Sequence, residues 1–373
     1  MLEEQAEELK KNSTLQRFKT NFWGVFSFVT IGIISLLSLF AYQLATDASP
    51  NANGMNLSIA LKPPGFSCKI LTLSGQRETE GVLFFDFFNG IKQNNVQIPI
   101  NSYHIKGDKL VYYPYSTQQV SLPKDISFKD LKVFSKEGIA QFEKHQIRDR
   151  YFLFGTDKFG RDLYSRMLIG ARVSLAVGFV SVFISLMLGI LLGVLAGFFG
   201  GWIDHLIMGM INIVWSIPTL LMVMAITLAL GKGFWQVFIA IGLTMWVEVA
   251  RVVRGQVLSI KEKQYVIAAK ALGFSRTRIL LKHILPNCLA PIIVISAANF
   301  ASAILVESGL SFLGLGAQPP TPSWGGIIKE HYSFILMGKS YLTLIPGGAM
   351  MVLVLSFMLI GNALRDALEV NKI

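Results

Sequence analysis

Long apolar stretches separated by polar ones dominate this chain. The uncharged runs of spanning length cover residues 24–42, 173–199, 206–230, 284–306 and 340–364. A hydrocarbon core of about 30 Å needs roughly 20 apolar residues in a helix, whose backbone groups must bond within the segment. A shorter run, 233–247, reaches that length only if Glu248 lies near one end of its helix. The pattern predicts an all-α integral membrane protein with about six transmembrane helices.

Composition and charge agree with this class and indicate an orientation. Hydrophobic residues make up 52% of the chain, charged residues make up 15%, and the mean hydropathy is +0.51. Residues 251–286 hold eight Lys and Arg residues against one acid, Glu262, and positively charged loops stay on the cytoplasmic side. Both termini are therefore expected in the cytoplasm and residues 46–172 outside. Topology explains the net charge of +11 better than nucleic-acid binding does.

The polar stretch after the first apolar run has its own character. Residues 46–150 gain Pro, Gly and Asn and include two strand-like runs, "GVLFFDFF" at 81–88 and "KLVYYPY" at 109–115. We expect an extracytoplasmic insert, α+β or mainly β, long enough for its own core. An elaborated loop packed on the helices is the alternative. The expected organisation is a cytoplasmic segment 1–22, a first span 23–45, the insert 46–150, a further external segment 151–172, a core 173–364 with five spans, and a tail 365–373.

Three features inside the apolar runs carry expectations. Small residues recur every four positions at Ser181, Ser185, Gly189, Gly193 and Gly197, so a neighbouring helix can approach closely, and packing within the chain is favoured over a subunit interface. Pro218 is expected to kink the third span. Glu248 and Arg251 are one turn apart, which favours a neutralising pair over a proton relay.

Motifs for catalysis and metal binding are absent from the sequence. It contains no HExxH, no GxSxG and no paired cysteines for zinc, and its five histidines lack metal-ligand spacing. Cys68 and Cys288 fall on opposite sides of the expected membrane, so no intrachain disulfide is expected. We therefore assign no catalytic or metal residue. If ATP is used, another chain must bind it.

The basic loop has the pattern of a docking element. Residues 264–272 favour a short helix, Gly273 can end it in the left-handed conformation, and Ser275 can cap a second helix. Ala268 and Ala269 would leave a shallow face on which another protein can pack. The sequence predicts a helix, a tight corner and a second helix that runs toward Pro286.

These residues resemble the dipeptide/oligopeptide/nickel family of ABC-importer permeases, specifically its C-type subunit. "AAKALG" followed by "LP" is similar to the EAA loop, which is the coupling helix of such permeases. "FGTDKFGRDLYSRMLIGARVSL" (154–175), "PNCLAPIIV" (286–294), "ESGLSFLGLGAQPPTPSWG" (307–325) and "LRDAL" (364–368) also match in order. The resemblance covers more than half of the chain.

The resemblance implies a bacterial inner-membrane complex. The partners would be a sister permease in a heterodimer, two ATP-binding subunits that hold ATP and Mg, and an extracytoplasmic solute-binding protein, with membrane lipid around the spans. By position, the coupling residues are Ala268, Ala269, Gly273, Leu285 and Pro286. The resemblance implies that this chain itself is not an enzyme and holds no cofactor.

Several positions depart from the family pattern. Ile267 replaces the Glu of the EAA signature, His283 replaces a later Ile, and Gly209 and Asn212 stand where many relatives carry Arg and Asp. Residues 51–150 have no counterpart in the family pattern, and we expect them to contact the binding protein, to cover the entrance, or only to stabilise the external face. Short peptides are the expected cargo. The alternative function is a membrane sensor or scaffold with an external ligand-binding domain.

Overall fold

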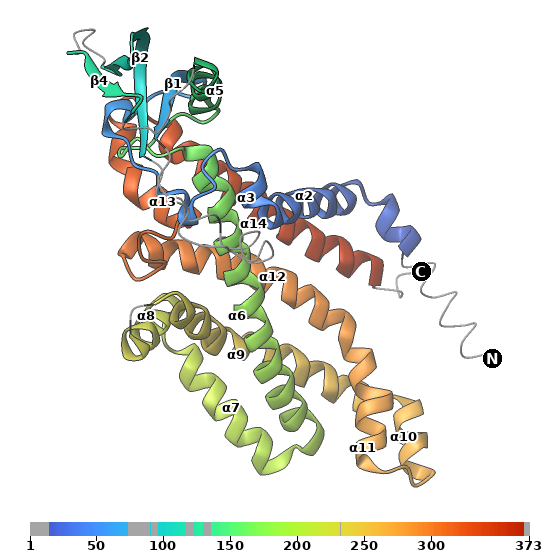
Figure 1. Cartoon of the computed structure of the whole chain (residues 1–373). Coiled ribbons are helices and arrows are strands. Elements are labelled where there is room, and N and C mark those ends of the chain that lie inside the picture. Colours follow the sequence, from blue (N-terminus) through green and yellow to red (C-terminus); the bar gives the residue numbers. More distant parts are fainter. Residues whose placement is uncertain are drawn as a thin grey trace. The chain divides into compact units, whose positions relative to one another are not determined.

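The computed structural model describes residues 15–73, 90, 96–116, 122–129, 136–231 and 233–368. It divides into two compact units. The first unit contains residues 1–35, 173–318 and 348–373, and the second contains 36–172 and 319–347. The boundaries between the units after residues 35, 172 and 347 each fall inside a long helix (Figure 1). Each unit is described by itself below.

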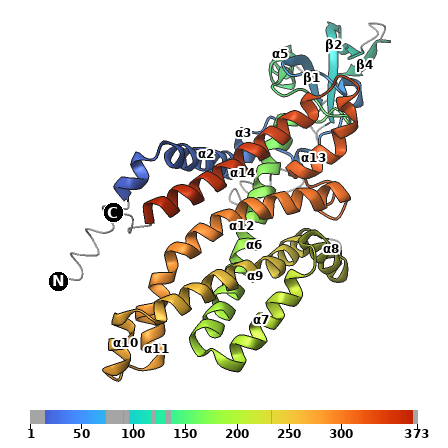
Figure 2. The same ribbon diagram turned by 180° about the vertical axis from the view of Figure 1, so that it is seen from behind.

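The first unit is built from helices. Their bounds are α2 Phe22–Leu39, α6 Leu163–Phe199, α7 Gly201–Trp215, α8 Thr219–Leu230, α9 Phe234–Lys261, α10 Gln264–Ala271, α11 Arg276–Ile279, the π-helical η3 Leu280–Ile284, α12 Leu285–Leu313 and α14 Tyr341–Leu368, of which α2, α6 and α14 also extend into the second unit. Helices α9 and α12 lie side by side, as both views show (Figures 1 and 2). The helical class expected from the sequence is confirmed.

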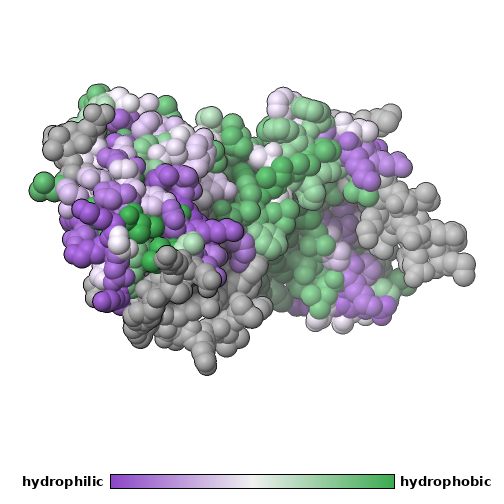
Figure 3. Space-filling view, turned by 45° about the horizontal axis from the view of Figure 1, so that its top comes forward, coloured by the Kyte–Doolittle hydropathy of each residue, from purple (hydrophilic) through white to green (hydrophobic). Residues whose placement is uncertain are grey.

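Five helical stretches of the described residues are long and apolar enough to cross a membrane. They are Phe22–Leu39, Leu163–Phe199, Phe234–Lys261, Arg276–Leu313 and Tyr341–Leu368. A sixth crossing is possible if α7 and α8 together form one broken span. Hydrophobic side chains cover broad, continuous areas of the surface that Figure 3 shows, as expected where helices face lipid.

The third expected span is broken, not merely kinked. Helix α7 ends at Trp215, α8 begins at Thr219, and the two axes differ by 93°. Pro218 has an extended backbone, with φ −53° and ψ 126°, and it lacks the N–H that would continue the helical ladder. A proline also disfavours the helical conformation of the residue before it. The single kinked helix expected over 206–230 is therefore replaced by two helices joined at a sharp corner.

The position of Glu248 along α9 differs from the expectation. The helix continues for thirteen residues beyond Glu248, to Lys261, so that Glu248 lies near its middle. The described residues contain no ion pair between Glu248 and Arg251, and the Arg251 guanidinium instead stacks on Trp215, 3.4 Å from the ring centroid. The aromatic ring of the adjacent α7 offers this cation a face, so the expected neutralising pair does not form.

The two faces of α6 differ in side-chain size. Gly189, Gly193 and Gly197 lie against α9, where a Cβ atom would come within 2.5 to 2.8 Å of Val249, Ala250 or Val257. Ser181 is fully buried and donates a hydrogen bond to the carbonyl of Phe238, at 3.0 Å. Ser185 is also fully buried. On another face, large side chains are more than half exposed at positions 179, 183, 187 and 191. The small residues thus lie at a helix pair within this chain.

The described residues of the second unit include a five-stranded antiparallel sheet. Its strands, in the order β4-β3-β2-β1-β5, are β1 Phe66–Leu73, β2 Val96–Lys106, β3 Lys109–Pro114, β4 Lys124–Ser127 and β5 Ile147–Phe152. Helix α5, Lys136–Gln146, packs Ile139 and Phe142 on a core that includes Leu71, Ile100 and Phe128. The expected strand at 109–115 is confirmed by β3, whereas the one at 81–88 lies outside the described residues.

The remaining elements of the second unit are short. They are α3 Ala41–Leu44, η1 Pro50–Ala52, η2 Leu57–Ile59, α13 Trp324–His331 and η4 Tyr332–Ile335. The last strand, β5, crosses residue 150, where we expected the insert to end, so the sheet includes the first residues of the following segment. Both cysteines are free and buried.

Candidate functional site

The 264–286 segment forms two short helices joined by a tight corner. Helix α10 ends at Ala271, and Gly273 follows in the left-handed conformation, with φ +76°. Only glycine adopts this conformation without steric cost, and its use as a helix terminator was the expectation from the sequence. The side chain of Ser275 accepts a hydrogen bond from the backbone N–H of Arg278 and so caps α11. Both local expectations are confirmed.

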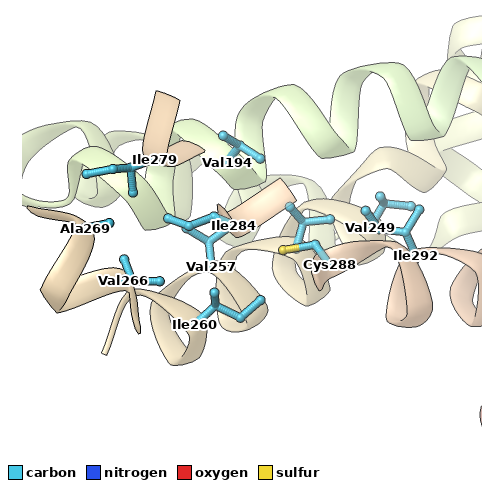
Figure 4. Packing of buried hydrophobic residues seen from close by; sticks show 11 residues of the cluster. Val194, Val249, Val257, Ile260, Val266, Ala269, Ile279, Ile284, Cys288 and Ile292 are labelled. Carbon is cyan, nitrogen blue, oxygen red and sulfur yellow. The ribbon is translucent and has the colours of Figure 1, made fainter. Parts of the chain in front are cut away.

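A hydrophobic cluster fixes this segment to three long helices (Figure 4). Val266 and Ala269 of α10 and Ile279 of α11 contribute buried side chains, all 5% exposed or less. They pack with residues of α6, α9, η3 and α12, namely Val194, Val249, Val253, Val257, Ile260, Ile284, Cys288 and Ile292. Because interiors of this kind are close-packed, a displacement of α10 is transmitted to the helices beneath it.

Ala268 and Ala269 are adjacent on α10 but differ in exposure, which corrects one expectation. Ala269 is 5% exposed and belongs to the cluster, so it cannot form part of a docking face. Ala268 is exposed. The exposed side also carries Tyr265, Ile267 and Leu272, whose exposed fractions are 47%, 56% and 73%. The sequence could not separate two adjacent alanines, because the answer depends on how the whole segment rotates onto α9 and α12. We call Tyr265, Ile267, Ala268 and Leu272 the apolar face.

Helix α12 begins with an irregular turn that Pro286 explains. Residues 280–284 form a π-helical turn, and Leu285 and Pro286 begin α12. Proline has no N–H to donate to the carbonyl four residues earlier, so the regular ladder is interrupted there. The side chain of Asn287 compensates nearby by donating to the carbonyl of His283, at 2.7 Å. This arrangement joins the corner segment to a spanning helix with no loop between them.

Basic residues of α9 make contacts that the sequence analysis did not find. Arg254 donates two hydrogen bonds to Asp204 at the start of α7, with Nε–Oδ1 at 2.5 Å and Nη2–Oδ2 at 2.7 Å. Lys261 donates from Nζ to the carbonyl of Phe198 at the end of α6, at 2.8 Å. These positions are 50 and 63 residues apart, so no short-range signal reveals them. Arg254 and Lys261 were explained from the sequence only as part of a positively charged loop. In the structure they also join α9 to α7 and to α6.

We expect Arg254→Met to lower the stability of the purified transport complex by about 1–3 kcal/mol, because the partly buried Asp204 carboxylate loses a bidentate partner. Thermal unfolding of the detergent-solubilised complex measures this. Arg148→Met is the matched control, since Arg148 is exposed and the described residues give it no ion pair. An Asp204→Asn/Arg254→Met double variant should recover part of the loss. Equal melting temperatures for Arg254→Met and Arg148→Met would contradict the prediction.

In the second unit, the "GTDKFGRD" segment forms a buried charge cluster. Asp157 and Arg161 are 0% and 2% exposed, with Arg161 Nε at 2.5 Å from Asp157 Oδ2. Arg161 Nη2 lies 2.7 Å from Glu330 Oε2 of α13, and Arg166 Nη2 lies 3.6 Å from the same oxygen. His331 is buried beside them, and burial lowers its pKa. Asp157, Glu330 and His331 lie close enough to hold a metal ion, but two arginines already neutralise the carboxylates.

Comparison with known proteins defines the class of this chain. Residues 189–370 match the family described as "Binding-protein-dependent transport system inner membrane component". The dipeptide transport system permease protein DppC of Alkalihalophilus pseudofirmus is 44% identical over 216 residues, which are 58% of this chain and 71% of that protein. The glutathione transport system permease protein GsiD of Shigella flexneri is 42% identical over the same shares of the two chains.

A solved structure of the MetNI methionine ABC transporter in inward facing conformations is also similar. It has a TM-score of 0.46 and 20% identity, and the match covers 54% of this chain and 96% of that one. The sequence relatives, and not this structure, establish the assignment. The protein is a permease of an ABC importer. It belongs to the family of binding-protein-dependent transport system inner membrane components and is a multi-pass inner-membrane protein, not an enzyme.

Proposed function

We propose that this permease imports short peptides as one half of a heterodimeric translocation path. The proposal has a sister permease, two ATP-binding subunits and an extracytoplasmic solute-binding protein as partners, with ATP and Mg held by the ATPases. The family in general works with such partners. Two relatives above 40% identity are named for dipeptide and glutathione transport, which supports a peptide cargo. Because both relatives are transport permeases, they also favour a permease over the alternative function of a membrane sensor or scaffold.

The observation that carries the proposed mechanism is the apolar face on α10. Three exposed positions of α10 and Leu272, which directly follows the helix, form it, and the opposite side of α10 is buried against α6, α9 and α12. An apolar face of this kind is typical of a protein contact, and Lys270, Arg276 and Arg278 beside it can meet acidic groups of a partner. In this proposal an ATPase packs on the apolar face, and its closure moves α10 together with the spanning helices. Gly273, Leu285 and Pro286 connect the moving parts.

The proposed topology has six spans and both termini in the cytoplasm. It counts α7 and α8 together as one broken span, which gives an even number of crossings. The 251–286 loop then lies in the cytoplasm, as its excess of Lys and Arg requires. The sheet of the second unit lies outside, where the binding protein delivers cargo. This topology puts the apolar face on the side where ATP is available.

Purification with partners and reconstitution test the function. The chain is purified from its native membrane in mild detergent, and the proteins that accompany it are identified by mass spectrometry. We expect a sister permease and two ATPase subunits in stoichiometric amounts. Proteoliposomes of that complex, supplied with the binding protein and ATP, should accumulate a radiolabelled dipeptide. A homo-oligomer free of ATPases, or a complete complex that imports no peptide, would overturn the proposal.

We also propose that the sheet between residues 66 and 152 contacts the binding protein or covers the entrance to the path. The sheet can be removed at a natural joint, because the N–H of Gly65 donates to the carbonyl of Phe152 at 3.0 Å. The deletion must spare residues 53–62, because this segment packs directly on the loop around Gly160. The backbone of Asn56 lies so close to Gly160 that no Cβ would fit there. A variant that joins Gly65 to Phe152 directly should assemble normally and import peptide at least several-fold more slowly. Unchanged uptake would show that the sheet only stabilises its surroundings.

A further inference from the structure

A cavity of about 190 Å³ lies among α7, α8, α9 and α12 in the first unit. Most of its lining is apolar, and its polar groups include Thr219, Thr244, Glu248 and Ser302. The cavity is smaller than the roughly 300 Å³ at which ordinary ligand pockets begin. It can therefore accept one end of a small molecule, not a whole peptide.

Glu248 is the charged residue of this cavity. It lies near the middle of α9, a helix apolar enough to cross a membrane, and it is exposed on this chain. Among the residues that the structure describes, none forms an ion pair or a hydrogen bond with its carboxylate. A charged side chain within a membrane span is costly and is normally retained for a functional reason.

The break between α7 and α8 lines the same cavity, through Val214, Trp215 and Ile217 and through Thr219 at the start of α8. The end of α7 carries a partial negative charge and the start of α8 a partial positive one, so the two helix ends oppose each other. The carbonyl of Val214 also already accepts the N–H of Ile217. The Glu248 carboxylate is therefore the group of the cavity that favours a positively charged ligand.

Among the described residues, two arginines that follow Glu248 in α9 make contacts elsewhere. Arg251 lies one turn from Glu248, but its guanidinium is held over the ring of Trp215, and it does not line the cavity. Arg254 is held by Asp204 through two hydrogen bonds. Arg254 is thus neutralised by Asp204, and Arg251 keeps its charge beside Trp215 without forming an ion pair with Glu248, whose carboxylate is left for a ligand.

We propose that Glu248, in the cavity at the break between α7 and α8, forms a subsite for the α-ammonium group of a short peptide during translocation. This inference rests on the proposed function, because it assumes a peptide cargo. A free amino terminus is the one cation that every unmodified peptide carries, whatever its side chains. Pairing with it replaces part of the hydration that the ammonium loses on entering an apolar path. The site would accept peptides with different side chains equally.

The test compares Glu248→Gln and Glu248→Asp with wild type in proteoliposomes of the whole complex. Uptake of radiolabelled dialanine and ATP hydrolysis are measured in the same vesicles, with the binding protein in saturating excess. Glutamine keeps the shape and removes the charge, so we expect about 10- to 100-fold less peptide imported per ATP, the range for loss of a charged hydrogen bond. Aspartate should retain much more of the uptake. Glu262→Gln, at the exposed end of the same helix and outside the cavity, should match wild type.

The outcomes separate this subsite from the proposed function. Wild-type vesicles that import no dialanine would overturn both. Normal uptake per ATP in Glu248→Gln beside an active wild type would overturn the subsite alone. A Glu248→Gln complex that melts earlier or loses its sister permease would also overturn it, because the carboxylate would then pair with a cation of that subunit. Only reduced uptake per ATP in a stable, fully assembled complex supports the inference.

Discussion

Replacing Gly193 with valine is expected to prevent α6 from packing on α9 and to reduce the amount of assembled transporter at least about tenfold. A Cβ atom at this position would lie 2.6 Å from the carbonyl oxygen of Ala250 and 2.8 Å from the Cβ of Val253. One of these neighbours is backbone, so no rotamer change relieves the contact, and the helices must separate. Overpacking of a core typically costs 1–3 kcal/mol, and a rigid backbone contact lies at the upper end of that range.

Gly255→Val is the control for this substitution. Gly255 lies within α9 itself, and a Cβ there would meet nothing within 4 Å in this chain. Both variants introduce the same β-branched residue into a helix, so their intrinsic helix propensities change equally. The yield of complex after size-exclusion chromatography and its melting temperature are the measurements. If Gly193→Val assembled as well as Gly255→Val, the α6–α9 contact would not be the close approach that the structure shows.

The size pattern of α6 could be recognised in the sequence because it is local. An interval of four places residues on one face of a helix, whatever that face contacts. The partner could not be predicted from the spacing alone. Its identity depends on where α9 lies, and α9 begins more than thirty residues after the last of these glycines.

Long-range contacts explain what the sequence missed. The pairing of Arg254 with Asp204 and the stacking of Arg251 on Trp215 each join different helices. The sequence instead suggested Glu248 as the partner of Arg251, because Glu248 is only one helical turn away. The corner at Gly273 was predictable, since a left-handed residue followed by a capping serine is a signal within three positions. Which of Ala268 and Ala269 faces outward could not be predicted, because tertiary packing decides it.

The break at Pro218 could be predicted only in part. Its position in an apolar run was enough to predict an interruption of the helix. The 93° angle between α7 and α8 is set by how each packs against α9, which the run itself does not encode. Residues on both sides of that break, Trp215 and Thr219 among them, line the cavity that contains Glu248.

Ala268→Glu is expected to lower ATP-driven peptide uptake at least about tenfold without unfolding the permease. Ala268 is exposed on the apolar face, so a carboxylate there is solvated in the isolated chain and does not disturb the cluster beneath. In the proposed complex, the same carboxylate would be forced into a contact with the ATPase and would lose its hydration there. Burying an unpaired charge costs several kcal/mol, which is enough to prevent productive docking.

Ala269→Glu should behave differently, and the comparison makes the test specific. Ala269 is 5% exposed within the cluster, so its substitution should disrupt the packing of α10 and reduce assembly itself. Gln16→Glu, at an exposed residue outside the apolar face, controls for the added charge. Uptake, ATP hydrolysis and co-purification of the ATPases are measured for all three variants. If Ala268→Glu retained its ATPases and imported peptide as Gln16→Glu does, the apolar face would not be the coupling surface, and the signal from ATP would have to enter the permease elsewhere.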